Sequence, residues 1–391
     1  MNELKFDVVL HLAGEQAVPN YMAVKLSEAQ QHILLTTKKT KAQYKLLAQM
    51  FPSEERLIRH VEVEATDYAA IRTTVSGISS LEGKKIGVNV TGGTKPMFAA
   101  ALDVCREKGF TPFYIDTQER MISFFTSDYL KLPMPRAFET VEEFVRLGNY
   151  KIKGKVKRSD DIPDVRRDLI KHFWDNRDWV RRVIGDFSKA TDKKYQSQKT
   201  RPPECYQNAL SLILNPRKGN KKEESLAIAW ERTFPPRTCD WRVAARFGAG
   251  EWFEEWLLLQ FANSRRSSDF CDLCSGLSLT FASGDNDKSI QEIDVAFTDG
   301  YMLTLIECKA GAVYQDHIQK LENLRRQIGG AMGRGFLCAI NYQDTSDVIV
   351  ERVRNGNISL ITGDKALRML PNRQEMIKPR RCYQDERDYE Q

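Results

Sequence analysis

Residues 291–310, which read QEIDVAFTDGYMLTLIECKA, constrain the fold of this 391-residue chain more than any other stretch. Two runs rich in β-branched and aromatic residues flank the dipeptide Asp299-Gly300, which is typical of the tight turn of a β-hairpin. A turn centred there predicts three cross-strand pairs on one apolar face: Ile293–Ile306, Val295–Thr304 and Phe297–Met302. We therefore expect two antiparallel strands that cover a core.

The opposite face of this hairpin would carry two acids and a lysine beside leucines. Asp294 is expected to lie diagonally from Glu307, with Lys309 following on the same side. Two close carboxylates repel each other unless a cation or a proton lies between them. Their oxygens are ligands that hard divalent metals prefer, and a lysine alongside can orient a water or offset charge on a phosphate. A lone D…ExK spacing is more often a solvated charged face, but the apolar runs around these acids favour a metal site.

The segment 248–262, GAGEWFEEWLLLQFA, precedes the hairpin and predicts a helix. Trp252, Trp256 and Leu259 recur at the i, i+4, i+7 spacing of an apolar stripe. The other side of the helix carries three acids, Glu251, Glu254 and Glu255. Any one of them can close an acidic pocket with the two hairpin acids, although such glutamates more often face solvent.

Further elements surround the hairpin. We expect a strand at 273–281, a helix at 314–329, and strands at 335–340 and 358–361. Helix, three antiparallel strands, helix and strand is the layout of a restriction-endonuclease-like α/β core. We therefore assign residues 246–391 to a C-terminal domain of this class.

Residues 1–130 alternate apolar strands with helices. Strands are expected at 6–12, 33–36, 58–63, 85–90, 110–115 and 121–125, and helices begin near residues 21, 40, 67 and 98. Such βαβ repetition predicts a mainly parallel, doubly wound, Rossmann-like sheet with helices on both faces. We assign residues 1–140 to this N-terminal domain.

Two polar segments follow strands of this sheet, at the edge where such folds bind ligands. The first, TGGTKPM, opens a helix: Gly92 and Gly93 permit close backbone approach, Thr94 leads into free helix amides that attract phosphate, and Lys95 adds a cation. It is neither GxGxxG nor a Walker loop, so neither a nicotinamide cofactor nor ATP hydrolysis is indicated.

The second segment, GEQAVPN, follows the first strand. Gln16 and Asn20 within it can read base or ribose edges, and Thr37, at the end of the second strand, is expected on the same rim. A Gly-Gly turn is by itself more often a plain tight turn. Several polar loops that converge at one sheet edge favour a nucleotide site.

The charge of the chain is unevenly distributed. Residues 151–250 hold 24 Lys and Arg against 13 Asp and Glu, so this stretch carries +11 within a chain of net charge +6. A basic middle beside an acidic segment suits a polyanionic substrate, although any single Lys or Arg can simply belong to a solvated helical surface. We expect residues 141–245 to form a basic helical or winged-helix-like linker, with helices near 170–187 and 206–214.

Composition bounds the cellular setting. No apolar run approaches the ~20 residues of a membrane span, and the N-terminus lacks a signal-peptide pattern. Eight scattered cysteines without an export signal predict free thiols in a reducing cytoplasm. Cys271 and Cys274 form a CxxC without a second pair at finger-like spacing, so thiols in a strand and turn are favoured over a structural zinc.

These motifs together resemble a known family. Asp294 with Glu307-Cys308-Lys309 matches the (D)…(D/E)xK signature of PD-(D/E)xK nucleases. The GEQAVPN loop and the TGGTKPM turn resemble those of CARF (CRISPR-associated Rossmann fold) domains. In this order and at this length, the chain is similar to the CARF–nuclease effectors of type III CRISPR defence.

The resemblance implies a cytoplasmic homodimer that binds one cyclic oligoadenylate, cyclic tetra-adenylate in particular, and then cleaves DNA and/or RNA with Mn²⁺ or Mg²⁺. Asp294 and Glu307 match the metal ligands, Glu254 matches an additional acidic position, and Lys309 matches the catalytic lysine. The family's ligand loops correspond to Gln16, Asn20, Thr37, Gly92, Gly93, Thr94 and Lys95. Gly14 stands where some relatives carry a serine hydroxyl, so cleavage of the activator is not implied.

Two other functions remain open from the sequence. One is a nucleotide-sensing regulator that binds DNA through the basic middle without catalysis. The other is an unregulated DNA-repair or restriction nuclease. Metal-dependent cleavage separates the nucleases from the regulator, and dependence on the cyclic nucleotide separates the two nucleases.

Overall fold

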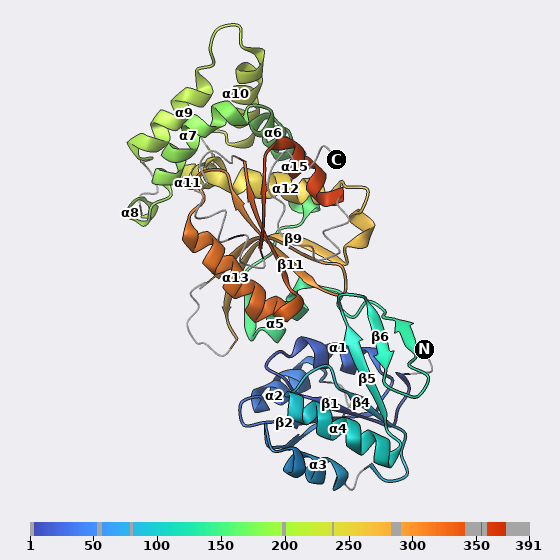
Figure 1. Cartoon of the computed structure of the whole chain (residues 1–391). Helices are drawn as coiled ribbons and strands as arrows, with labels where there is room; N and C mark the ends of the chain where they lie inside the picture. The colour runs from blue at the N-terminus through green and yellow to red at the C-terminus, as the bar shows by residue number, and fades with distance from the viewer. Residues whose placement is uncertain are drawn as a thin grey trace.

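The structure, a computed structural model, describes residues 4–52, 57–78, 81–197, 201–236, 238–282, 291–340, 353 and 358–372. The N-terminal sheet lies at one end of the molecule, a second sheet lies in the middle, and a block of helices lies at the other end (Figure 1). Within the described residues, no helix is long and apolar enough to span a membrane.

The N-terminal sheet has seven strands in the order β3-β2-β1-β4-β5-β6-β7. β1 to β5 are parallel to their neighbours and β6 and β7 are antiparallel, so the predicted doubly wound sheet is confirmed. The strands are β1 (Val8–Leu12), β2 (Gln31–Thr36), β3 (Leu57–Glu62), β4 (Ile86–Asn89), β5 (Thr111–Asp116), β6 (Met121–Phe124) and β7 (Lys131–Pro133).

Helices cover both faces of this sheet because its central strands are apolar on both sides. β1 reads VVLHL and is buried along its whole length. Val8 and Leu10 belong to the core cluster under α3 and α4, whereas Val9 belongs to the cluster under α1 and α2. The helices are α1 (Val18–Leu26), α2 (Lys41–Met50), α3 (Tyr68–Ser76) and α4 (Lys95–Lys108).

The C-terminal sheet has six strands in the order β13-β12-β11-β10-β9-β8. β8 to β11 are antiparallel and β11 to β13 are parallel, as expected of a restriction-endonuclease-like core. Its faces are covered by α13 (Gln315–Gly329) and by α12 (Trp252–Ala262). The strands are β8 (Tyr150–Lys153), β9 (Asp272–Phe281), β10 (Gln291–Thr298), β11 (Leu303–Lys309), β12 (Arg334–Ala339) and β13 (Ile358–Thr362).

The predicted register of the central hairpin is wrong by two residues. The observed pairs are Val295–Ile306, Ala296–Leu305, Phe297–Thr304 and Thr298–Leu303, which leaves residues 299–302 as the loop. Asp299 closes this longer loop, because its Oδ1 accepts from the backbone N–H groups of Tyr301 and Met302 at 3.0 Å each. Gly300 adopts φ +87° within it. A shift of two residues keeps Val295, Phe297 and Ile306 on one face of the sheet, as expected.

The first residues of the expected linker belong instead to the C-terminal sheet. α5 (Val141–Leu147) begins with a capping box at Thr140 and packs with α13. β8 then pairs with β9 and forms an edge of the sheet. Tyr150 and Ile152 alternate with exposed lysines and pack in the core cluster that includes α13. This period-two pattern gives residues 150–153 a half-buried strand rather than a helix.

From residue 164 to residue 246, the regular elements that the structure describes are all helices, which together form the helical block. The predicted helix over 170–187 is two helices, which meet at Asn176. The block packs directly on α12: Trp174 of α6 stacks on Trp256 with ring centroids 3.5 Å apart and 5° between the planes. The helices are α6 (Asp164–Asp175), α7 (Arg177–Ala190), α8 (Lys193–Gln196), α9 (Glu204–Leu214), α10 (Lys221–Thr233) and α11 (Trp241–Arg246).

Cys271 and Cys274 carry free thiols, as do the other cysteines that the structure describes. Cys274 is buried in β9, and burial raises the pKa of its thiol to about 12. Cys271 lies just before the strand, with Arg136 Nη1 at 3.7 Å from its sulfur. Among the described residues, neither cysteine belongs to a group that could hold a metal.

Candidate functional site

A break in the regular alternation of the sheet positions the first predicted catalytic acid. Ile293 packs in the core cluster on the α13 side, whereas Val295 packs in the cluster under α12. The prediction that these two residues share one face is therefore wrong. On β9 the residue level with Asp294 is Gly276, which has φ +64°. A glycine in this conformation inside a strand is typical of an irregularity that re-aims a neighbouring side chain.

The D…ExK residues do converge. Asp294 Oδ2 accepts from the backbone N–H of Cys308 at 2.7 Å, which ties β10 to β11 beside the motif. Lys309 Nζ lies 2.7 Å from Glu307 Oε1 and 3.8 Å from Asp294 Oδ2. From α13, Lys320 Nζ lies 3.2 Å from Glu307 Oε2. One lysine therefore contacts both acids of the motif, and a second reaches the buried Glu307 from the helix that covers the sheet.

Two of the three glutamates near the start of α12 are already paired. Lys157 contacts Glu251 at 2.7 Å and also pairs with Glu255. Arg166 of α6 donates from Nε to Glu255 at 2.7 Å. The Arg166 pair joins α6 to α12, and the Lys157 pairs join the segment before α6 to the start of α12. Glu254 is half-buried and has neither an ion pair nor a hydrogen-bond partner among the described residues, so it is the glutamate left to face the hairpin acids.

The electrostatics of this cluster favour a bound cation. Burial raises the pKa of Glu254 well above its usual value, and the charge of Asp294 raises it further. Burial also raises the pKa of Asp294, to about 6, with Glu307 as the second cause. Burial alone would lower the pKa of Lys309, but Asp294 and Glu307 raise it more, so its charged form is retained. Carboxyl groups that resist ionising side by side become stable anions when a divalent cation lies among them.

No group of three or more His, Cys, Asp or Glu side chains in the described part of the chain is already arranged to hold a metal. The donor set still fits a hard divalent cation, because Asp294, Glu307 and Glu254 offer carboxylate oxygens and nothing softer. Two of these three acids have raised pKa values, and Glu254 forms no ion pair within the described part of the chain. Two ammonium groups, those of Lys309 and Lys320, contact Glu307.

The second predicted site lies at the carboxyl edge of the N-terminal sheet, between β1 and β4. Here the strand order reverses, which is where open α/β sheets bind ligands. The turn after β4 passes so close to β1 that a Cβ on Gly92 would lie 2.3 Å from Leu12 O, and Gly93 has φ +80°. Thr94 caps α4 with its side chain, and Lys95 is exposed in the first turn of that helix.

Asn20 and Thr37 are buried supports of this rim. Asn20 Nδ2 donates to Leu12 O at 3.3 Å, and its Oδ1 accepts from Asn89 Nδ2 at 3.1 Å. The hydroxyl of Thr37 lies 3.2 Å from that of Thr40, at the start of α2. Both side chains thus already have partners inside the domain, in contrast to the exposed Lys95.

Gln16 reaches across to the other domain. Its Oε1 accepts from the backbone N–H of Ala331 at 2.7 Å, in the short 3₁₀ turn η6 (Gly330–Met332) that follows α13. Nearby, Lys25 Nζ donates to Glu143 of α5 at 2.9 Å. The loop that was predicted to bind a ligand is therefore also part of the contact between the two sheets' domains.

Sequence reasoning missed Lys320 and a buried histidine pair beneath the rim. His11 Nε2 lies 3.0 Å from His32 Nδ1, and Asn89 Nδ2 lies 3.4 Å from His11 Nδ1. Burial, followed by the neighbouring His32, lowers the pKa of His11 well below its usual value. A histidine inside the otherwise apolar strand VVLHL is the signal that marks this pair. Nothing in the spacing of α13 marks Lys320.

Two family models match the two domains that carry these sites. Residues 8–139 match the Card1 CARF domain, and residues 241–380 match the Card1-like endonuclease domain. The chain belongs to the Card1-like CARF nucleases. This membership confirms the family resemblance and the nuclease class expected from the motifs. A comparison with curated protein sequences gives no match.

Solved structures share the fold of this Card1-like nuclease along most of its length. Can2 from Sulfobacillus thermosulfidooxidans, in complex with cyclic tetra-adenylate, is 20% identical with a TM-score of 0.72, and the match covers 94% of this chain and 97% of Can2. The protein VC1899 from Vibrio cholerae is 16% identical with a TM-score of 0.76, covering 97% of this chain and 100% of its own. At these identities the likeness establishes the fold.

A further neighbour is a DNA nuclease of type III CRISPR defence that is activated by cyclic oligoadenylate. It is 17% identical with a TM-score of 0.51, and the match covers 85% of this chain and 45% of that nuclease. The larger neighbour therefore contains parts that have no counterpart in the present chain.

Proposed function

We propose that this protein is a nuclease of type III CRISPR defence that cyclic oligoadenylate, in particular cyclic tetra-adenylate, activates to cut DNA and/or RNA. One observation carries the proposal: a single chain holds both a carboxylate–lysine cluster on the endonuclease sheet and a glycine-rich rim at the switch point of the CARF sheet. The cyclic tetra-adenylate bound to Can2 and the activated DNA nuclease among the neighbours support the choice of activator.

At the cluster, Asp294, Glu307 and Glu254 would hold Mn²⁺ or Mg²⁺. Such a cation lowers the pKa of a bound water and stabilises charge on a phosphate under attack. Lys309, already 2.7 Å from Glu307, would orient the attacking water or stabilise negative charge on the phosphate oxygens. Lys157 and Arg166 would keep α12 in place through the two neighbouring glutamates, so that Glu254 stays aimed at the hairpin.

At the rim, the phosphates of the activator would meet backbone N–H groups after Gly92 and Gly93 and the ammonium of Lys95. Thr94, Asn20 and Thr37 would shape the loops, and Gln16 would exchange its bond to the other domain for one to the ligand. A cyclic tetranucleotide has internal symmetry, so a homodimer with two such rims facing each other would bind one ring. Gly14 offers no hydroxyl for cutting that ring.

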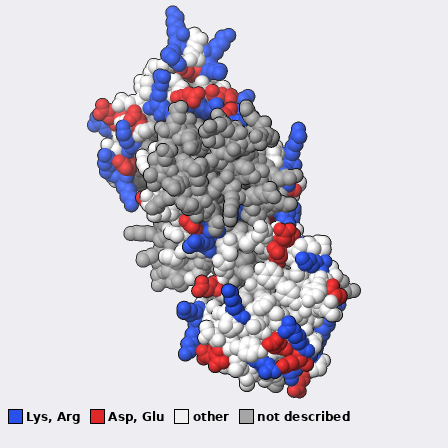
Figure 2. Space-filling model, in the orientation of Figure 1, with Lys and Arg blue, Asp and Glu red and all other residues white. Residues whose placement is uncertain are grey.

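The helical block would attract the nucleic-acid substrate. Lys and Arg side chains project from the end of the molecule that carries α9 and α10, with Asp and Glu interspersed (Figure 2). A net charge of +11 over residues 151–250 raises the local concentration of a polyanion, and the affinity it gives falls with salt.

The test is cleavage of labelled single-stranded DNA, duplex DNA and RNA with Mn²⁺ or Mg²⁺ and cyclic tetra-adenylate. We expect Asp294→Ala and Glu307→Ala to lower the rate by at least about a hundredfold. Glu292→Ala, an exposed acid on the same strand, is the matched control and should cleave normally. Binding of nucleic acid without cleavage would instead support a regulator, and cleavage that ignores the cyclic nucleotide would support an unregulated nuclease.

A further inference from the structure

An exposed tyrosine follows the strand that carries Glu307 and Lys309. β11 ends at Lys309, and the loop 310–313 leads directly to Tyr314, the residue that precedes α13. The side chain of Tyr314 is 63% exposed. An aromatic ring whose face is open to solvent can receive any of the four bases by stacking. The ring therefore meets the first condition for a contact with a nucleic acid.

His317 holds Tyr314 in place. The backbone N–H of Tyr314 donates to His317 Nδ1 at 3.1 Å, and the backbone carbonyl of Tyr314 accepts from the His317 N–H at 3.1 Å. The two rings meet edge to face, with centroids 5.6 Å apart and 62° between the planes. A ring that is already oriented loses less conformational freedom when a ligand binds to it. Tyr314 is thus both accessible and preorganised.

The Tyr314–His317 pair lies beside the carboxylate cluster. His317 and Lys320 are three residues apart on α13, so their side chains are neighbours on one face of the helix. Lys320 Nζ in turn lies 3.2 Å from Glu307 Oε2. The electrostatics agree with this placement: burial lowers the pKa of His317, the charge of Lys309 lowers it further, and Glu307 raises it. The ring of His317 is therefore within electrostatic reach of Lys309 and Glu307.

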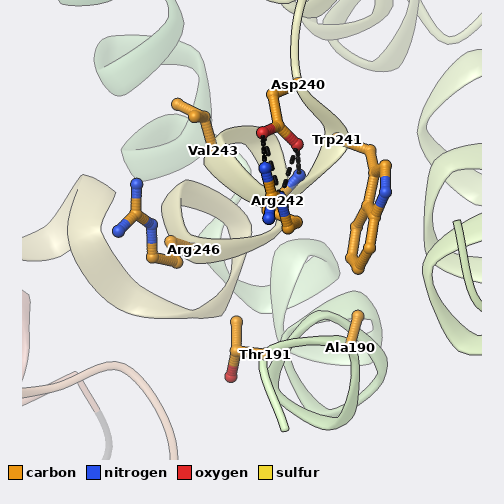
Figure 3. Close-up of a pocket in the computed structure, with 7 residues that line it drawn as sticks. All are labelled: Ala190, Thr191, Asp240, Trp241, Arg242, Val243 and Arg246. Carbon is orange, nitrogen blue, oxygen red and sulfur yellow. Dashed lines mark hydrogen bonds and ion pairs between the residues drawn. The ribbon is translucent and has the colours of Figure 1, made fainter. Parts of the chain in front are cut away.

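The pocket beside α11, on the side that faces the end of α7, is different (Figure 3). Its aromatic lining residue, Trp241, is only 7% exposed and belongs to the core cluster of the helical block. Its carboxylate, Asp240, already pairs with Arg242. A base stacks only on a ring whose face is open, so Tyr314 meets a condition that this pocket does not.

We propose that Tyr314 is a substrate subsite that stacks on an unpaired base next to the phosphate being cut, and that His317 is the positioning residue that orients its ring. The inference rests on the proposed nuclease function and deepens it. A base that stacks on Tyr314 is not paired with a complementary strand, so the subsite selects strands that are single or locally opened at the cut. Stacking does not depend on the sugar, so the subsite accepts DNA and RNA alike.

The first test compares Tyr314→Ala with Tyr314→Phe on a single-stranded oligonucleotide, with activator and Mn²⁺. We expect Tyr314→Ala to raise KM about five- to a hundredfold and to change kcat less than about threefold, because a base contact is lost but the carboxylate cluster is intact. Tyr314→Phe keeps the ring and should stay within about twofold of the wild type. Tyr129→Ala is the matched control, because Tyr129 is a 74% exposed tyrosine between β6 and β7 of the CARF sheet.

The second test locates the base. The wild-type protein cuts a series of oligonucleotides that each carry one abasic site, at positions on both sides of the cut. One position should raise KM about five- to a hundredfold, and Tyr314→Ala should be insensitive to that same position. A flat abasic series would overturn the subsite, and so would an unchanged KM in Tyr314→Ala. A change of oligomeric state in Tyr314→Ala, measured at the assay concentration, would also overturn it, because Tyr314 would then contact a second copy of the chain.

The role of His317 is tested through Tyr314. His317→Ala should raise KM severalfold in the wild-type background and have no further effect in Tyr314→Ala, because His317 acts on the base only through that ring. His317→Gln should recover part of the loss, since a glutamine at this third helical position can still accept from the Tyr314 N–H. Equal effects of His317→Ala in both backgrounds would contradict the positioning role.

Failure of the subsite is distinguishable from failure of the proposed function. If the wild-type protein cuts the oligonucleotide and Tyr314→Ala cuts it with the same KM, the nuclease stands and the subsite is wrong. If the wild-type protein cuts nothing, the proposed function fails. Fluorescence anisotropy with the same oligonucleotides and variants then still decides the subsite, because stacking on Tyr314 does not require cleavage.

Discussion

Gln16 Oε1 accepts from the backbone N–H of Ala331 at 2.7 Å, and this bond joins the ligand rim of the CARF sheet to the end of α13. α13 also carries Lys320, whose ammonium lies 3.2 Å from Glu307 Oε2. The 15-residue helix α13 therefore carries the lysine that contacts Glu307 and leads directly into the turn that contacts Gln16. A ligand that takes Gln16 for itself changes the restraint on the helix that holds Lys320 at Glu307.

Gln16→Ala should raise cleavage in the absence of activator. The bond is a restraint of the resting arrangement, and a net hydrogen bond contributes about 0.5–1.5 kcal/mol, so its loss shifts the resting equilibrium by about two- to tenfold. The measurement is the activator-free rate. Glu15→Ala, an exposed neighbour in the same loop, is the control and should keep the wild-type rate. An unchanged or lower activator-free rate in Gln16→Ala would show that the bond does not restrain the enzyme.

The two lysines at Glu307 should give different kinetic signatures. Lys320→Met removes an ammonium that competes with a metal ion for the same carboxylate, so we expect half-maximal activity at a severalfold lower Mn²⁺ concentration. Lys309→Met should instead lower kcat by about a hundredfold at saturating metal, because Lys309 contacts both acids of the motif. A Mn²⁺ titration of both variants decides between these roles. Identical behaviour of the two variants would contradict the assignment.

Asp294→Asn should stabilise the metal-free protein above neutral pH. Burial, followed by Glu307, raises the pKa of Asp294 from 3.8 to about 6 in the folded state. The stability that the protonated carboxyl group of Asp294 contributes is therefore fully present below about pH 3.8 and is lost as the pH rises through about 6. Thermal unfolding in chelator at about pH 8 should show a gain of about 1–3 kcal/mol for the variant, shrinking towards about pH 4.

Glu292→Gln is the matched control for this stability measurement. Glu292 is an exposed carboxylate two positions earlier on β10, so its neutralisation should leave the unfolding temperature nearly unchanged across the same pH range. Wild-type protein that is more stable than Asp294→Asn at about pH 8 would mean that the carboxylate is not held in an unfavourable, buried position.

The helical block and the endonuclease sheet should unfold together. Trp174 and Trp256 stack in one core cluster that also includes Val295 and Ile306 of the sheet. Trp256→Ala should lower the free energy of unfolding by about 3–5 kcal/mol. Calorimetry should still show a single transition in which both parts unfold together. Leu212→Ala, at an exposed position of α9, should cost little. A separate low-temperature transition of the block in the wild-type protein would contradict this coupling.

Local patterns of the sequence predict most elements, but they do not predict contacts that tertiary structure decides. The hairpin follows from Asp299-Gly300, yet its register depends on the bonds that Asp299 Oδ1 accepts from two backbone N–H groups of the loop, which favour a longer loop. The break at Asp294 depends on Gly276, a residue of another strand. Short apolar alternation in residues 150–153 is too brief to reveal the edge strand β8.

The choice among the three glutamates of the α12 segment illustrates the same limit. Glu251, Glu254 and Glu255 are chemically equivalent in the sequence, and only the positions of Lys157 and Arg166 distinguish them in space. These two cations come from residues almost a hundred positions earlier, and no local spacing connects them to α12. The resemblance to a family singled out Glu254. The structure adds a physical reason, because Lys157 and Arg166 already pair with Glu251 and Glu255.

The most direct test of the account compares the rate of Mn²⁺-dependent cleavage with and without cyclic tetra-adenylate, in the wild-type protein and in Lys95→Ala. We expect the ring to raise the wild-type rate by at least about tenfold. Lys95→Ala should need a higher concentration of the ring for the same rate, because a phosphate contact is lost. A wild-type rate that is the same with and without the ring would contradict it.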